Sequence, residues 1–228
     1  MHTSQEGQSQ FVDQLWKGKK NGFFVEAGAS DGKHFSNSYF FEKNRGWTGL
    51  LMEPNTQPFQ RLLQNRPASY AINGCLGTTN KTSKVEFQVR QGEFLELAKI
   101  SQGPHSTAVK TIQSLPLYSI LRAIGVDTID YFSLDIEGPE LEVLKTIPWD
   151  KVKINVITIE YRATPGTPNG QAVSQQRMDM FMNYFKSLGL YDFVQNISQL
   201  DLVFARKDLN KDTKAANKST SNVTAKRL

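Results

Sequence analysis

Five short apolar runs recur along the chain and constrain its fold more than any other feature of the sequence. They are residues 22–28, 48–54, 69–73, 129–135 and 154–160. Near-continuous hydrophobicity over this length is typical of strands that are buried on both faces. The segments between the runs carry helical spacing, as in TQPFQRLLQNR (56–66) and PELEVLKTI (139–147). This alternation predicts a single α/β domain with a doubly wound, mostly parallel sheet.

The end of the sequence predicts a different arrangement. A long helical segment, VSQQRMDMFMNYFKSLG, precedes two β-rich runs, 191–197 and 201–207, that are separated by a short polar turn. We expect these runs to form a C-terminal antiparallel hairpin. Residues 84–90 alternate like an exposed edge strand, and we interpret the region 84–113 as an insertion over the carboxyl edge of the sheet that can act as a substrate lid.

Charge divides the chain into a nearly neutral body and a basic tail. The net charge is +5, and residues 207–228 hold six Lys or Arg against two Asp, which leaves +1 for the remainder. We therefore expect a flexible N-terminus (1–10), a folded domain (11–206) and a disordered basic tail (207–228). A nearly neutral body argues against nucleic acid as a partner. The single cysteine, Cys75, excludes an internal disulfide.

Membrane signals are also missing from the sequence. No apolar run reaches the ~18 residues of a transmembrane helix, and MHTSQEGQSQ lacks the apolar core of a signal peptide. The sequence alone predicts a cytoplasmic protein. An endoplasmic reticulum, Golgi or endosomal location is expected instead if an upstream anchor is missing.

The end of the first run carries the first candidate ligand-binding residues. It reads Glu26-Ala27-Gly28-Ala29-Ser30-Asp31-Gly32, and small residues there let the backbone turn tightly against a ligand. The carboxylate of Glu26 can receive the ammonium group of an amino-acid moiety. Because any turn from strand to helix can use Gly28 and Gly32, an ordinary structural turn is the alternative.

Glu53 ends the second run and supplies a second, independent signal. A carboxylate at this strand end is placed to accept both hydroxyls of a ribose, and the alternative is a solvated Glu53 that caps the following segment. Ser30 stands where a dinucleotide-binding loop has its second glycine, and Asp31 would repel phosphate. An amino-acid end without phosphate therefore fits better, which describes S-adenosylmethionine.

Three more carboxylates follow the fourth and fifth runs. Asp135 and Glu137 precede a Gly-Pro helix start, and Glu160 ends the fifth run, so all three line the same expected cleft. They can act as a general base, as ligands of a substrate hydroxyl or as metal ligands, or they can cap the helix that starts near Pro139. His34 is a second candidate base. The histidines show no metal-ligand spacing, and we predict no metal site.

Three segments together resemble a known family. FFVEAGASDG, SNSYFFEKNRGWTGLLMEPN and YFSLDIEGPELEVLK look like the successive blocks of the FkbM-type methyltransferases, in that family's order. The resemblance implies a class I methyltransferase fold and S-adenosylmethionine as cofactor. It assigns Asp135 and Glu137 to the acceptor side. The residues that it implies for the cofactor are Glu26, Gly28, Asp31, Gly32, Ser36, Asn37 and Glu53.

Two functions follow from this resemblance. The first is methyl transfer to a hydroxyl oxygen of a small molecule or sugar, with Asp135, His34 or Glu160 as catalytic residues. The second follows from the spelling of the first two segments, which is similar to the animal subgroup of the family that the insect protein Star typifies. In that reading the domain is a non-catalytic module that binds membrane-protein cargo in endoplasmic reticulum–Golgi and endosomal trafficking and in EGF-receptor ligand signalling.

Overall fold

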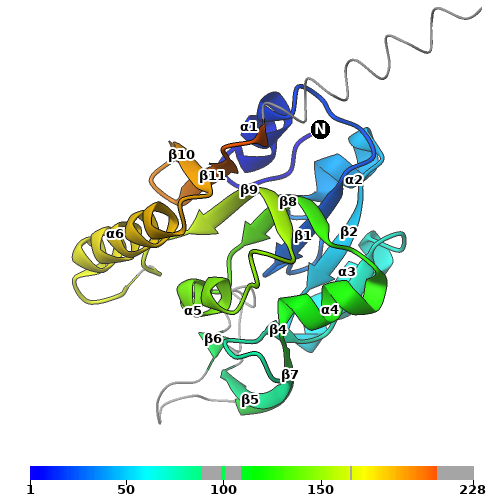
Figure 1. The fold of residues 1–228 in the computed structure, drawn as a ribbon. Helices are drawn as coiled ribbons and strands as arrows, with labels where there is room; N and C mark the ends of the chain where they lie inside the picture. Colours follow the sequence, from blue (N-terminus) through cyan, green and yellow to red (C-terminus); the bar gives the residue numbers. More distant parts are fainter. Residues whose placement is uncertain (89–98, 101–108, 165, 210–228) are drawn as a thin grey trace, which may run out of the picture.

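In the computed structural model, a seven-stranded sheet runs through the middle of the molecule (Figure 1). The structure describes residues 1–88, 99–100, 109–164 and 166–209. The order of the strands across the sheet is β10-β11-β9-β8-β1-β2-β3. Their bounds are Phe23–Ala27 for β1, Thr48–Met52 for β2, Tyr70–Ile72 for β3, Thr128–Leu134 for β8, Lys153–Glu160 for β9, Tyr191–Ile197 for β10 and Asp201–Arg206 for β11.

Strand directions confirm the predicted fold class. The neighbours β3, β2, β1, β8 and β9 pair in parallel, whereas β11 runs antiparallel to both β9 and β10. Glu26 on β1 pairs with Leu51 on one side and Ser133 on the other. Since parallel strands end at the same edge of a sheet, this register brings the residues that follow β1, β2 and β8 together.

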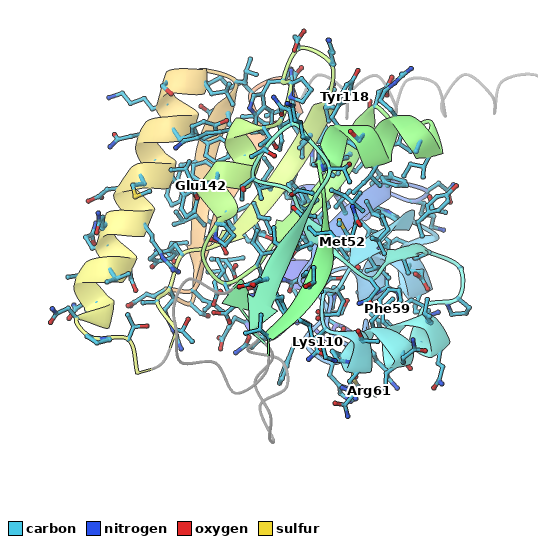
Figure 2. The ribbon with its side chains drawn as sticks, turned by 90° about the horizontal axis from the view of Figure 1, so that it is seen from below. Met52, Phe59, Arg61, Lys110, Tyr118 and Glu142 are labelled. Carbon is cyan, nitrogen blue, oxygen red and sulfur yellow. The ribbon has the colours of Figure 1, made fainter. Side chains whose placement is uncertain are left out.

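Helices cover both faces of the sheet (Figure 1). One side holds α1 (Gln8–Leu15), α2 (Tyr39–Arg45) and α3 (Thr56–Asn65), and the other holds α4 (Leu117–Ile124), α5 (Glu140–Lys145) and α6 (Gly170–Leu188). Figure 2 looks onto the second side, where Tyr118 marks α4 and Glu142 marks α5.

Each face has its own apolar core. Phe41, Trp47 and Leu62 are buried between the sheet and the first group of helices. Leu121 and Phe185 are buried on the opposite face. Because the central strands have helices on both faces, both sides of each strand are apolar, which explains the near-continuous hydrophobic runs in the sequence.

A smaller sheet follows β3 in the chain. It consists of β4 (Cys75–Leu76), β7 (Val109–Leu115), β5 (Ser83–Gln88) and β6 (Lys99–Ile100), in that order. The strand expected at 84–90 is confirmed over most of its length by β5. Parts of two expected segments lie outside the described residues: 89–98 and 101–108 of the expected lid, and 210–228 of the expected disordered tail.

The first ten residues differ from the flexible terminus that the sequence suggests. Ser4 forms an isolated parallel bridge with Phe35, and α1 starts at Gln8. Val12 and Trp16, one helical turn apart, are buried, so α1 is tied to the body by its apolar face. Among the described helices, none combines the length and the apolar character that crossing a bilayer requires.

Candidate functional site

A cavity of about 370 Å³ lies at the carboxyl ends of the parallel strands. Glu26 from β1, Glu53 after β2, Asp135 after β8 and Glu160 from β9 all line it. The convergence of these carboxyl groups on one cavity is the arrangement that their positions in the sequence predict. A ligand in this cavity therefore meets side chains from four neighbouring strands.

Glu26 is buried and organises the loop that precedes α2. Its Oε1 accepts a hydrogen bond from the backbone N–H of Asn37 at 2.7 Å, and its Oε2 accepts one from the Ser36 hydroxyl at 2.8 Å. The Ser38 backbone N–H (3.3 Å) and hydroxyl also donate to Oε2. The carboxylate thus fixes residues 36–38 at the cavity wall.

Asn37 lines this cavity and carries a hydrogen-bond acceptor that has no partner among the described residues. Its Nδ2 donates to the Ser133 hydroxyl at 2.9 Å, but its Oδ1 is buried and has no hydrogen-bond partner within the described part of the chain. The residue as a whole is 8% exposed. Because a buried acceptor without a donor is costly, this atom fits a ligand that brings an N–H group. Glu26 and Asn37 together therefore suit the ammonium end of an amino acid.

Gly28 is required by the close approach of two strand ends. Its φ is +85°, and a Cβ at this position would lie 1.8 Å from the carbonyl oxygen of Asp135. The N–H groups of Gly28 and Ala29 both donate to the Met52 carbonyl at 3.0 Å. The turn therefore stays tight and leaves the space above it to the cavity.

Glu53 is 7% exposed and lies on the other side of the turn. Its Oε2 accepts from the backbone N–H of Ser30 at 2.9 Å, and its Oε1 accepts from that of Asn55 at 2.7 Å. Burial raises the pKa of Glu53 from 4.5 to about 7, and the two backbone N–H groups offset only part of that rise. Each oxygen keeps acceptor capacity for a hydroxyl group of a ligand.

Asp31 and Gly32, which the sequence suggested as cofactor ligands, build the loop and do not line the cavity. Oδ1 of Asp31 accepts from the backbone N–H groups of Lys33 (2.9 Å) and His34 (2.8 Å). Burial acts to raise the pKa of Asp31, but these bonds and the one to the His34 ring outweigh it and lower the pKa. Gly32 has a φ of +74° and packs against Arg66.

His34 lies at the rim of the cavity. Its side chain is 73% exposed, and its Nδ1 lies 2.6 Å from Oδ2 of Asp31. The aspartate therefore orients the imidazole ring. This contact between residues three apart gives Asp31 a role in holding His34.

Asp135, Glu137 and Glu160 form a tight acidic group at the cavity wall, and one carboxylate oxygen of each lies within 4.8 Å of the others. Burial, and then the charge of Glu160, raise the pKa of Asp135 well above its usual value. Burial also raises the pKa of Glu160 to about 7. The interaction with Glu160 acts to raise the pKa of Asp135, whereas the interaction with Asp135 acts to lower the pKa of Glu160.

Glu137, the third member of this group, is held by a residue outside the Asp135–Glu160 pair. Oε2 of Glu137 accepts a hydrogen bond from the Thr164 hydroxyl at 2.8 Å, and its φ is +63°. The spacing of the three carboxylates is one at which oxygen ligands hold a cation, although acidic groups also cluster without one. Glu140 holds the loop before α5 by accepting hydrogen bonds from the N–H groups of Ile136 (3.2 Å) and Gly138 (2.9 Å).

The sequence did not indicate several of the residues that line the cavity. They are Gln5, Gln8, Phe35, Arg162 and Thr164. Gln8 is 2% exposed, and its Nε2 donates to Oδ2 of Asp201 at 2.5 Å. The only local signal for this placement is the spacing of Val12 and Trp16, which indicates a docked helix.

Comparisons with known proteins bear on the family and the fold of this chain. A family profile described as the Methyltransferase FkbM domain matches residues 26–190. The crystal structure of a methyltransferase FkbM from Methylobacillus flagellatus superposes with a TM-score of 0.52 at 17% identity, over 81% of this chain and 43% of that chain. An SAH-bound methyltransferase from Podospora anserina gives a TM-score of 0.53 at 10% identity, over 90% of this chain and 80% of that one.

These identities establish a shared fold, and the family match goes further. This chain spans less than half of the bacterial FkbM methyltransferase. No curated protein matches the chain by sequence. The profile match covers the strands and loops that build the cavity, from Glu26 at the end of β1 to the residue before β10. The chain therefore belongs to the FkbM methyltransferase domain family.

Proposed function

We propose that the protein is an S-adenosylmethionine-dependent methyltransferase that acts on a hydroxyl oxygen of a small molecule or sugar. The observation that carries this proposal is the single cavity lined by Glu26, Glu53, Asp135 and Glu160. Membership of the FkbM family supports methyl transfer. The carboxyl pair on the acceptor side supports an acceptor that loses a proton.

The cofactor side of the cavity fits S-adenosylmethionine. When bound, this cofactor supplies an electrophilic methyl group. Glu26 and the unpaired Oδ1 of Asn37 would hold its ammonium group, since both residues line the cavity and both carry acceptor oxygens. Glu53 would accept both ribose hydroxyls, and the turn at Gly28 lets the backbone come close to the ligand.

Asp135 and Glu160 are the residues that we assign to proton transfer. A hydroxyl group that forms a bond to carbon must release its proton, and a base whose pKa lies near the working pH does this best. The pKa of Glu160, about 7, meets this condition. Glu137, held by Thr164, is placed to orient a hydroxyl of the acceptor. His34 lies at the rim with a side chain that is 73% exposed, so we assign it no step.

The trafficking alternative has weaker support. No observation on the described residues, and none of the comparisons, favours the animal Star-like subgroup over other branches of the family. A module that only binds protein cargo on its surface needs no polar cavity at the strand ends. We therefore place methyl transfer first.

Isothermal titration with S-adenosylmethionine and with S-adenosylhomocysteine tests the proposal. We expect both to bind wild-type protein. Glu53→Ala removes the acceptor of two hydroxyl groups, and bonds to a charged group contribute about 1.5–3 kcal/mol each. We expect affinity to fall at least ~10-fold while the circular dichroism spectrum stays native.

Glu142→Ala is the matched control, because Glu142 is exposed on α5 and does not line the cavity. Its affinity should equal that of the wild type. Absence of heat for both ligands at millimolar concentration would contradict the proposed cofactor. Incubation of the protein and cofactor with a panel of hydroxylated small molecules and sugars, followed by mass spectrometry for the gain of one methyl group, then tests the acceptor class.

A further inference from the structure

Arg66 is a buried charge that lies directly behind the cavity wall. It caps the C-terminus of α3, the helix marked by Phe59 and Arg61 in Figure 2, and its side chain is 0% exposed. Its Nε donates to Oε2 of Glu42 at 2.7 Å. Buried guanidinium groups are rare unless all their donors are used, so the remaining donors indicate what this side chain does.

Those remaining donors point into the loop that carries the cofactor residues. Nη1 donates to the carbonyl of Gly32 at 2.9 Å and to the hydroxyl of Ser36 at 3.3 Å. Nη2 donates to the hydroxyl of Ser38 at 3.1 Å. One planar fork thus holds both ends of residues 32–38, from a helix that lies outside the loop.

The same hydroxyl groups connect Arg66 to Glu26. Ser36 and Ser38 both donate to Oε2 of Glu26. A guanidinium group only donates, so each serine hydroxyl accepts from Arg66 and directs its single hydrogen at the carboxylate. Arg66 therefore sets the direction of the hydrogen bonds that end on a residue of the cavity wall.

Gly32 shows how closely the loop follows this side chain. A Cβ on Gly32 would lie 2.8 Å from Cγ of Arg66 and 3.0 Å from Cγ of Leu62. Only glycine leaves room for the aliphatic part of Arg66 under the loop. The requirement for glycine at this position thus comes from the arginine and not from a ligand.

We propose that Arg66 is a positioning residue for cofactor binding: it holds residues 32–38 so that Glu26 and Asn37 keep their places in the cavity wall. This inference rests on the proposed function. The competing account is that Arg66 and Glu42 are only a structural ion pair. A buried ion pair is weak support for stability, because apolar replacements of both partners are often neutral or stabilising.

The double variant Arg66→Met/Glu42→Met separates the two accounts. It removes both charges, so neither is left buried without its partner, and it keeps similar volume. We expect a thermal midpoint close to that of the wild type and an S-adenosylmethionine Kd at least ~10-fold higher. Arg66→Lys keeps the charge but lacks the planar fork that reaches all four partners of Arg66 at once, and we expect a similar loss of affinity.

The control is Arg45→Met/Asp13→Met, which removes a different Arg–carboxylate pair. Arg45 donates to Asp13 through Nε and Nη2, both at 2.7 Å, and neither residue lines the cavity. Its Kd should match the wild type. Ser36→Ala/Ser38→Ala is the second test, because it cuts the link between Arg66 and Glu26 without touching a charge.

The outcomes separate this inference from the proposed function. Wild-type protein that fails to bind the cofactor contradicts the proposed function, and the inference falls with it. Wild-type binding together with unchanged affinity in the folded Met/Met variant overturns the role of Arg66 alone. If the Met/Met variant does not fold, the serine double variant decides: a raised Kd at native thermal midpoint supports the inference, and a wild-type Kd overturns it.

Discussion

Burial of Glu53 links the architecture of the site to the stability of the whole protein. The side chain is 7% exposed, and its pKa rises from 4.5 to about 7 on folding, mainly because burial disfavours the charged form. The folded state therefore binds this proton more tightly than the unfolded state. The resulting stability is fully present below the unfolded pKa and is lost as the pH rises through the folded pKa.

The magnitude of this loss follows from the two pKa values. Between pH 5 and pH 8, a shift from 4.5 to about 7 lowers the free energy of unfolding by about 2.5 kcal/mol. Glu53→Gln removes the titrating group and keeps the size of the side chain. Its amide changes the hydrogen bonds from Ser30 and Asn55, but that change is the same at both pH values and cancels in the comparison.

The assay is urea denaturation of both proteins at pH 5 and at pH 8. We expect the wild type to lose about 2.5 kcal/mol more than Glu53→Gln across this interval. Glu160 and Asp201, whose pKa values are also raised, act equally in both proteins. Glu142→Gln, on an exposed residue of α5, should behave like the wild type. Equal pH dependence in wild type and Glu53→Gln would refute the reasoning.

Two further substitutions test other parts of the site. Gly28→Ala should destabilise the protein by at least about 2 kcal/mol in urea denaturation and abolish cofactor binding, because its Cβ would lie 1.8 Å from the carbonyl oxygen of Asp135. The control is Gly125→Ala, at a φ of +72° where the added Cβ has nothing within 4 Å. It should cost only about 1 kcal/mol in the same urea denaturation. Gln8→Ala should cost about 1–3 kcal/mol at pH 8, because buried Asp201 loses its donor. At pH 5, below the pKa of about 6 of Asp201, the cost should be smaller, and an equal cost at both pH values would count against this role of Gln8.

The strands were predictable because their burial leaves a direct trace in the sequence. The runs at 129–135 and 154–160 agree with β8 and β9 to within one residue at each end, since strands covered by helices on both faces must be apolar throughout. α1 was not predicted as a helix. It starts with the polar residues QSQ, and Val12 is its only buried apolar side chain, so local composition resembles that of a free terminus.

Site residues at strand ends were predictable for a similar reason. Glu26, Glu53 and Glu160 each interrupt or end an apolar run, and the topology of a parallel sheet brings such positions to one edge. The contacts that hold these residues in place were not predictable. Arg66 meets Gly32 and Ser36 across 34 and 30 positions, and Gln8 meets Asp201 across 193. No periodicity encodes such pairings, because they depend on which helices pack beside which loop.

The raised pKa values argue that the acidic wall serves a ligand. Glu53, Glu160 and Asp201 are all easier to protonate in the folded protein than in the unfolded chain, so each lowers stability as the pH rises past its folded pKa. Glutamine or asparagine at these positions would avoid that cost. Two of these groups, Glu53 and Glu160, line the cavity. A fold that keeps them there gives up stability at neutral pH, and groups of this kind concentrate where proteins bind and react. The Glu42–Arg66 pair fits the same argument, because its contribution lies in the orientation of Ser36 and Ser38 toward Glu26, which an apolar pair of equal volume could not supply.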